Sequence, residues 1–288
     1  MNVAARQWGR TGGDVAPPDD GKDKFSTASK SFGTGALAGR SLLDGITLEY
    51  GPTELLGRFF LKADAALRAR GISLSFATLD ELVAVNKRNA DTWRPLISIF
   101  DPAFGGIKLE NSFVLLGRDR GGDVVATQAA RLFSWTDTNF ATEAQSLRLF
   151  YSAPDRQSLP NEQVVVTAAT AHNVQGRVVF SGGVWFDPRY RARFLTGILP
   201  RISRACAFAR WYTDMTTTMM AEALIHKGVA ARVGYSEIDW DVTLLNTRFG
   251  NQRFGLLTMQ TAEMLDDLGR FIEEIDAQVD RRIENRAG

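Results

Sequence analysis

The stretch VWFDPRYRARFLTGILP, residues 184–200, joins an apolar strand pattern to a helical pattern through a bend rich in arginine. Its first three residues end the run GRVVFSGGVWF, which is apolar along nearly its whole length. A strand of this kind is typical of the centre of a sheet, where both faces are buried. The Asp-Pro step that follows predicts a turn, with Asp187 as the turn-forming residue. We therefore expect a central strand, a basic bend, and a helix over about 195–210.

The composition excludes several classes of protein. The 288 residues are 44% hydrophobic and 23% charged, as in an ordinary globular protein, and the formal net charge is +1. Because this charge gives no global field, we expect no nucleic-acid partner. No apolar run approaches the length of about 18 residues that a membrane span requires, so we expect none. His172, His226 and Cys206 are too few and too far apart for a usual zinc site, and we expect no metal.

The chain is predicted to hold one domain with extensions at both ends. A single cysteine and the lack of a signal-peptide pattern favour a cytoplasmic protein. Residues 1–40 have too few apolar side chains to bury, which predicts a disordered tail. We expect a domain over 41–260, with its core over 72–260, and a helix over 261–288. One apolar stripe on that helix is expected to dock on the domain or on a second copy in a homodimer. The stripe consists of Leu268, Phe271, Ile272, Ile275, Val279 and Ile283.

Strand and helix patterns follow one another along the rest of the chain, which predicts a mixed α/β fold of the α+β type. Thr78 and Glu81 have the spacing of a capping box, so a helix should follow the strand ISLSFAT. Gly121 and Gly122 supply the positive φ of a tight hairpin. We expect EQVVVTAAT and GRVVFSGGVWF to form a second antiparallel pair. The remaining patterns predict a strand over 212–218, a helix over 219–232 and strands near 240–246 and 254–259.

This order of elements resembles the GNAT superfamily of acyl-CoA-dependent N-acyltransferases over residues 72–260. In that family the fourth strand enters a loop of the form P-x-Y-R-G-x-G-x-G/A, whose amides hold the pyrophosphate of coenzyme A at a helix N-terminus. Pro188, Tyr190, Arg191 and Arg193 stand where such a pattern places them.

The resemblance implies a site for acetyl-CoA or a longer acyl-CoA, as co-substrate, at the end of the central strand and in the bend. The implied residues are Val184, Trp185, Phe186, Arg191, Ala192, Arg193, Phe194, Leu195 and Thr196. Phe194 departs from the family pattern, because its ring stands where a glycine lets the pyrophosphate approach the backbone. Taken without the resemblance, Arg191 and Arg193 are solvated turn residues after a core strand.

The activity that the resemblance implies is transfer of an acyl group from acyl-CoA, or from an acyl carrier, to an amine of a small molecule or peptide. The amine attacks the thioester directly, so the reaction needs a base, donors for an oxyanion and an acid for the thiolate. In the family the oxyanion donor is a backbone N–H of the fourth strand, where the fifth strand diverges from it. The matching positions here are 184–186.

Few residues qualify for the proton transfers. As the base we favour Asp214, on the short strand expected to line that divergence, over Glu143. The alternative for Asp214 is a strand-end carboxylate that binds nearby backbone or Arg210. The tyrosine that acts as acid in the family falls on Ala230, and His226, one helical turn earlier, is the candidate substitute.

Two other classes of function stay open. A GNAT-fold module that binds acyl-CoA or a partner without turnover would account for Phe194 and Ala230. A part of a protein assembly would use the stripe on the C-terminal helix as its main surface.

Overall fold

The computed structural model describes residues 40–104, 106–191 and 193–287, with the backbone alone for 278–287. The predicted tail over 1–40 therefore lies outside the described residues, apart from Arg40. The strands are β1 (Ser73–Ala77), β2 (Ser112–Arg118), β3 (Val124–Trp135), β4 (Gln163–Val166), β5 (Gly176–Phe186), β6 (Met215–Ala221), β7 (Glu237–Thr247) and β8 (Gly250–Gln260). The α-helices are α1 (Leu42–Gly45), α2 (Thr53–Arg68), α3 (Leu79–Arg88), α4 (Phe140–Gln145), α5 (Pro154–Gln157), α6 (Leu195–Trp211), α7 (Glu222–His226), α8 (Val229–Arg232) and α9 (Thr261–Ala287). Short 3₁₀ turns are η2 (Ser98–Phe100), η3 (Leu109–Asn111), η4 (Ala169–His172) and η5 (Pro188–Tyr190).

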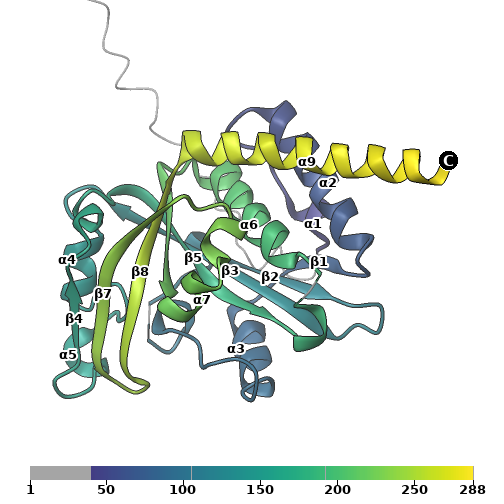
Figure 1. Ribbon diagram of the computed structural model, residues 1–288. Coiled ribbons are helices and arrows are strands. Elements are labelled where there is room, and N and C mark those ends of the chain that lie inside the picture. Colours follow the sequence, from purple (N-terminus) through teal and green to yellow (C-terminus); the bar gives the residue numbers. More distant parts are fainter. Residues whose placement is uncertain (1–39, 105, 192, 288) are drawn as a thin grey trace, which may run out of the picture. The chain divides into compact units, whose positions relative to one another are not determined.

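The eight strands form one sheet in the order β1-β2-β3-β5-β6-β8-β7-β4 (Figure 1). Within the described residues, β5 and β6 run parallel and every other neighbouring pair is antiparallel. Along the chain the elements follow the predicted order, apart from the placement of β4 and the two short helices that replace one helix after β6. The predicted mixed α/β fold is therefore confirmed.

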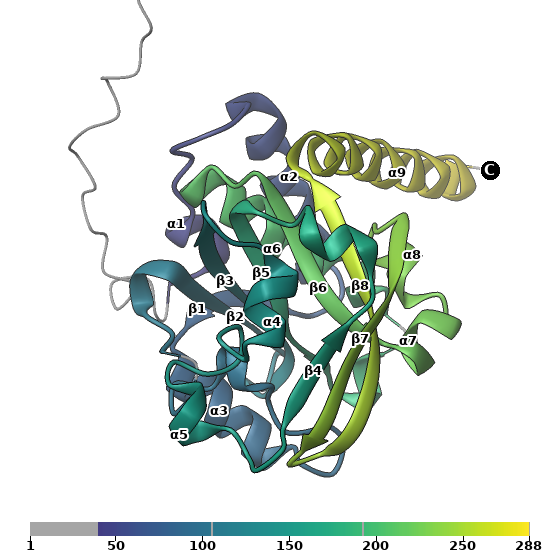
Figure 2. The ribbon, with the colours of Figure 1, turned by 90° about the vertical axis from the view of Figure 1, so that its left-hand side faces the viewer.

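Helices cover both faces of the sheet, with α2, α6 and α9 on one face and α3 on the other (Figures 1 and 2). Phe59 of α2 and Leu268 of α9 belong to one hydrophobic core, and Leu82 of α3 belongs to a second. Strand β5 supplies both cores, Val179 to the first and Phe180 to the second. Its unbroken apolar sequence thus reflects a central strand, as predicted.

Local signals in the sequence set several element boundaries. The Thr78 hydroxyl accepts a hydrogen bond from the Glu81 N–H at 3.1 Å and caps α3. The hairpin between β2 and β3 turns at Gly122, whose φ is +87°. Helix α6 begins at Leu195 and continues through the buried Pro200, close to the predicted range. The cap and the helix are confirmed, and of the two glycines predicted to have a positive φ in the hairpin, Gly122 has one and Gly121 does not.

The expected antiparallel pairing of β4 with β5 is wrong. Strand β4 pairs with β7, for example Val164 with Leu244, and lies at the edge of the sheet. Both sides of β5 are already taken, by β3 along its length and by β6 over a short segment. The residues between β4 and β5 form the 3₁₀ turn η4 instead of a hairpin.

The helix expected over 219–232 is also wrong. Strand β6 continues to Ala221, because it pairs with β8 up to the contact between Ala221 and Phe254. Two short helices, α7 and α8, follow it and are separated at Gly228, whose φ is +67°. A left-handed residue of this kind ends one helix and redirects the chain.

The apolar stripe on α9 docks on the domain over the part whose side chains are described. Leu268, Phe271 and Ile272 are buried, and the Phe271 ring lies 5.7 Å from that of Phe59 on α2. The side chains of Val279 and Ile283 lie outside the described set. A homodimer through α9 stays a prediction.

Candidate functional site

Strand β5 loses its neighbour on one side before it ends. The parallel pairing with β6 extends only from Val178 and Met215 to Phe180 and Thr217. Beyond this point β6 continues along β8, while β5 continues along β3 alone. We call residues 181–186 the unpaired segment, because they pair with β3 on one side and have no neighbouring strand on the side of β6. Val184 lies in this segment and is 42% exposed. The divergence implied by the resemblance is thus present in the backbone, and its open end lies toward the basic bend.

A bulge in β5 shapes the unpaired segment. Its pairing register with β3 shifts at Gly183, which has a φ of +59°. The Thr127 hydroxyl donates to the Gly183 carbonyl oxygen at 2.7 Å and fixes the bulge. A Cβ atom on Gly182 would lie 2.5 Å from the Phe100 ring. The bulge therefore depends on two glycines and brings η2 directly against β5.

The other two β5 residues implied for the acyl-CoA site, Trp185 and Phe186, have side chains packed inside the protein. Trp185 is buried, stacks on Trp93 with ring centroids 5.6 Å apart, and donates its indole N–H to the Thr92 hydroxyl at 3.2 Å. Phe186 belongs to the core beneath α6. Only backbone groups of these two residues are thus candidates for a ligand contact, while their rings join β5 to the loop after α3.

The first part of the bend is held by Asp187. Its carboxylate accepts the Arg189 N–H at 2.8 Å and pairs with the Arg189 guanidinium at 2.9 Å, and this hydrogen bond from Arg189 lowers the pKa of Asp187. The Tyr190 hydroxyl lies 3.1 Å from Asp119 of the β2–β3 hairpin. Asp187 is therefore the turn-forming residue, as predicted.

The two arginines proposed for phosphate binding contact protein carbonyl groups. Arg191 donates to the carbonyl oxygen of the last residue of β5 at 3.1 Å and to that of Thr92 at 3.2 Å. Arg193 donates to the carbonyl oxygen of Arg70 at 3.3 Å. Both side chains are exposed, while Ala192 between them lies outside the described residues. A phosphate bound here would have to exchange with these carbonyl groups.

Phe194 covers the start of α6. Its φ of +59° is left-handed, and its ring leans on Gly197, where a Cβ atom would lie 2.6 Å from the ring. The ring is 42% exposed. Leu195 is buried and Thr196 is half-buried. The first turn of a helix is where backbone amides bind anions, so the ring stands close to the implied pyrophosphate position.

Asp214 lies at the closed end of the β5–β6 pairing, not at the open end. Its carboxylate accepts the Arg177 N–H at 2.7 Å and contacts Gly176, directly before the paired residues. This is the strand-end role that the sequence left as the alternative. The structure does not bring Asp214 to the unpaired segment.

Glu143 lies on α4, in the segment between β3 and β5. It binds the Thr138 hydroxyl at 2.8 Å and the Arg148 guanidinium at 2.7 Å. Burial alone would raise the pKa of Glu143, but the hydrogen bonds from Arg148 and Thr138 outweigh it and hold the pKa below its usual value. A carboxylate held in this state is a weak base.

His226 and Ala230 do not share a helix. The His226 side chain is 73% exposed and lies 3.6 Å from Glu222, whereas Ala230 is buried in the core. The break at Gly228 separates them. His226 is thus not a substitute on the same helical face as Ala230, and Asp214, Glu143 and His226 lie on three separate elements.

A buried ionic cluster at the interface of α6 and α9 was not foreseen from the sequence. Arg201 binds both carboxylate oxygens of Asp267, at 2.8 and 2.9 Å, and Arg204 lies 3.3 Å from the same carboxylate. The Arg204 side chain has no exposed surface and its guanidinium lies over the Tyr235 ring. The sequence did not predict this cluster, because Asp267 lies more than 60 residues after the two arginines and no local pattern connects them.

A hollow of about 290 Å³ next to the unpaired segment was also missed. It lies between α3, the loop after it and the turn between β7 and β8. It is lined by Val83, Asn86, Lys87, Ala90, Trp93, Pro95, Leu96, Asp101 and Arg248. Because Arg248 lies far along the chain from the other lining residues, which all fall within 83–101, only the folded chain brings them together.

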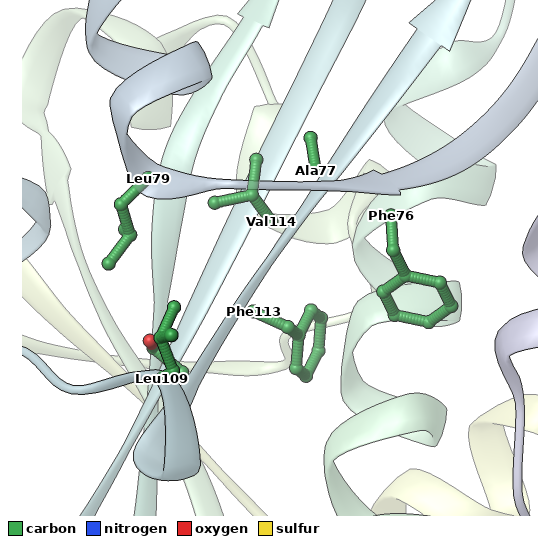
Figure 3. A pocket seen from close by; sticks show the side chains of 7 residues that line it. Phe76, Ala77, Leu79, Leu109, Phe113 and Val114 are labelled. Carbon is green, nitrogen blue, oxygen red and sulfur yellow. The ribbon is translucent and has the colours of Figure 1, made fainter. Parts of the chain in front are cut away.

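A second hollow is too small to bind a ligand. It has a volume of about 10 Å³, the space of one water molecule, and lies where β1 and β2 pair (Figure 3). Its lining is Phe76, Ala77, Leu79, Leu109, Ser112, Phe113 and Val114. Figure 3 shows mostly apolar side chains around it, so it is a packing gap.

The described ranges lack a metal-binding cluster and a membrane-spanning helix. They hold no group of three or more His, Cys, Asp or Glu side chains placed to bind a metal ion. Among the helices described there, none is long and apolar enough to cross a bilayer. Cys206 is buried, which raises the pKa of its thiol far above the usual value. It is therefore a packing residue rather than a nucleophile.

Comparison with known proteins finds likeness only among solved structures. A scan against protein-family models finds no match, and a search of curated proteins finds none either. One similar structure is the ribosomal-protein-S5-alanine acetyltransferase of Vibrio fischeri, with a TM-score of 0.40 and 10% identity over 66% of this chain and 93% of that one.

Two further structures show the same degree of likeness. An aminoglycoside acetyltransferase in complex with coenzyme A and kanamycin has a TM-score of 0.38 and 9% identity, over 67% of this chain and 96% of that one. An uncharacterised protein of Bacillus halodurans has a TM-score of 0.41 and 10% identity, over 71% of this chain and 92% of that one.

Proposed function

We propose that this chain is an acyltransferase that moves an acyl group from a thioester, carried by acyl-CoA or an acyl carrier, to an amine. The observation that supports this most is the loss of β5–β6 pairing after Phe180. Beyond that residue β5 has one side without a neighbouring strand, and backbone groups on such an edge bind extended chains that carry amides. The pantetheine arm of a thioester donor is a chain of that kind.

The reaction at this segment would run in one displacement. The ammonium of the acceptor first loses a proton, and the neutral nitrogen attacks the thioester carbonyl carbon. The C–N bond forms, the C–S bond breaks, and the thiolate takes the second proton of the nitrogen, which gives an amide and a thiol. We assign the stabilisation of the oxyanion to backbone N–H groups of 184–186, since Val184 is exposed there.

We assign both proton transfers to water. Asp214 binds backbone at the closed end of the strand pair, Glu143 is paired with Arg148, and His226 is exposed on α7. These positions favour roles other than proton transfer for all three residues. On this proposal the acceptor is an amine of a small molecule or a peptide. The protein acts in the cytoplasm.

A second candidate is a module that binds an acyl thioester without turnover. The Phe194 ring over Gly197 favours it, because the ring occupies the start of α6 where a pyrophosphate would meet backbone amides. Carriers with a single phosphate, or no phosphate at all, would be less affected by this ring than coenzyme A.

Thiol release separates the two candidates. Purified protein is mixed with acetyl-CoA or acetyl-pantetheine, which lacks every phosphate, and with a panel of primary amines. We expect release that depends on the amine, and we expect Phe194→Gly to increase the release from acetyl-CoA by about tenfold while acetyl-pantetheine serves as the internal control. Folded protein that binds either thioester but releases no thiol with any amine would overturn the acyltransferase and leave the binding module.

A further inference from the structure

The hollow beside the unpaired segment is held open by its own hydrogen bonds. The Asn86 side chain is buried, donates to the Arg94 carbonyl oxygen at 2.9 Å and accepts the Leu96 N–H at 3.2 Å. Arg248 donates to the Leu96 carbonyl oxygen at 3.2 Å and lies over the Phe104 ring. The loop after α3 is thus fixed to both α3 and the β7–β8 turn, so the hollow exists before any ligand arrives.

The hollow combines an apolar wall with three charged groups. Val83, Trp93 and Leu96 are among the apolar residues of the wall, and the charged residues are Lys87, Arg248 and Asp101. In the described part of the chain none of these three forms an ion pair. Two cations and one carboxylate around an apolar wall match a ligand that carries an anion, a cation and an apolar body.

Contacts between side chains also connect the hollow to the unpaired segment of β5. Trp93 in its wall stacks on Trp185. Asp101 directly follows Phe100, whose ring lies against Gly182. A ligand held between Trp93 and Asp101 is therefore next to the strand where the thioester is proposed to lie.

We propose that this hollow binds the acceptor, and that the acceptor is a free amino acid with an apolar or aromatic side chain. Its carboxylate binds Lys87 and Arg248, its ammonium faces Asp101, and its side chain lies on the Trp93 wall. This assignment of the acceptor rests on the proposed acyl transfer. After loss of a proton from the ammonium, its nitrogen forms the new C–N bond as the C–S bond of the donor breaks, and the product is an N-acyl amino acid.

Three probes test the chemistry of the ligand by calorimetry with the full chain and no donor. L-phenylalanine has both an ammonium and a carboxylate. L-phenylalaninamide has a neutral amide in place of the carboxylate, and 2-phenylethylamine has a hydrogen atom there. We expect L-phenylalanine to bind at least about tenfold more tightly than either of the other two probes. Only L-phenylalanine has a carboxylate that can accept charge-assisted hydrogen bonds from the lining cations.

A pair of neighbouring variants locates the site. Lys87→Gln removes a lining cation, whereas Arg88→Gln removes the adjacent exposed cation, which does not line the hollow. We expect Lys87→Gln to weaken L-phenylalanine about tenfold and 2-phenylethylamine hardly at all, and Arg88→Gln to leave both unchanged. In turnover, Lys87→Gln should raise KM for the amino acid and leave kcat unchanged.

The outcomes separate this inference from the proposed function. Equal affinity for the three probes, or equal effects of the two variants, overturns the amino-acid site. Thiol release that proceeds with 2-phenylethylamine as well as with L-phenylalanine overturns the acceptor class but leaves the acyltransferase. Selective binding of L-phenylalanine without thiol release from either thioester keeps the ligand site and overturns both its role as acceptor site and the acyl transfer itself.

Discussion

Two groups of arginines stand on either side of the start of α6 and have opposite surroundings. The bend arginines, Arg189, Arg191 and Arg193, are exposed and contact Asp187 or protein carbonyl groups. The helix arginines, Arg201 and Arg204, are buried and share Asp267. An exposed guanidinium can exchange a protein acceptor for a phosphate at little cost, whereas a buried one cannot lose its carboxylate without large destabilisation. The same residue type thus offers ligand binding in one group and fold stability in the other.

The largest expected effect comes from Asp267→Asn. This change leaves Arg201 and Arg204 buried without a carboxylate, and breaking a buried ion pair from one side typically costs about 3–5 kcal/mol of the free energy of unfolding. Denaturant-induced unfolding measures it. Asp266→Asn, at the exposed neighbouring position, should change the free energy of unfolding by less than about 0.5 kcal/mol. Similar losses for the two variants would contradict the assigned role of the cluster.

The bend arginines should show the reverse behaviour. Replacing both Arg191 and Arg193 with Ala should weaken coenzyme A binding by about tenfold to several thousandfold, since each charge-assisted hydrogen bond contributes about 1.5–3 kcal/mol. The free energy of unfolding should change by less than about 1 kcal/mol, because both side chains are exposed. Calorimetric titration with coenzyme A and acetyl-CoA measures the first quantity. Arg58→Ala, exposed on α2, controls for net charge. Absence of binding by the folded wild type would leave the bend as a turn.

Within the helix arginines, the two positions should differ. Arg201 binds both oxygens of Asp267 and the carbonyl oxygens of Gly197 and Arg232. Arg204 has two buried nitrogen atoms without a hydrogen-bond partner among the described residues. Arg201→Met should therefore destabilise the fold by about 3 kcal/mol and Arg204→Met by only about 1–2 kcal/mol. Unfolding curves of the two variants give the ranking, and a greater loss for Arg204→Met would reverse this interpretation.

The smallest effect is the pH response of the bend. The hydrogen bond from Arg189 lowers the folded pKa of Asp187, so the pair is fully present above the usual pKa of an aspartate, about 3.9, and is lost only as the pH falls through the lower folded value. Carbon NMR of the Asp187 carboxyl should show a titration midpoint below that of a free aspartate. In Arg189→Ala the midpoint should return toward the ordinary value. A midpoint that Arg189→Ala leaves in place would exclude the pair as the cause.

The sequence predicted those parts of the fold that depend on neighbouring residues. The Thr78 cap, the turn at Gly122 and the central position of β5 each follow from a few consecutive side chains. The partner of β4 was predicted wrongly because its pairing joins residues about 80 positions apart, as with Val164 and Leu244. The helix over 219–232 failed because pairing with β8 outweighed the local helical pattern.

The candidate site was predicted less completely than the fold, for the same physical reason. The bend follows from one continuous stretch, and the divergence after Phe180 was implied by the resemblance. By contrast, Asp214 was predicted on a strand that lines the divergence, but it directly precedes β6 at the closed end of the pairing, since a strand pattern does not show where pairing starts or stops. The hollow is lined by Lys87, Asp101 and the distant Arg248, and no spacing along the chain predicts that these residues lie together.

The two edges of the sheet bear on self-association. At one edge the Phe76 N–H donates to the Arg40 carbonyl oxygen at 3.0 Å, and Ser41 forms a bridge with Ser75, so β1 is already covered. At the other edge β4 is four residues long and covers part of β7. Covered or very short edges resist the strand-to-strand stacking that leads to aggregates. A second copy that joins this protein is therefore expected to meet it through helices, and the sheet is expected to end within each molecule.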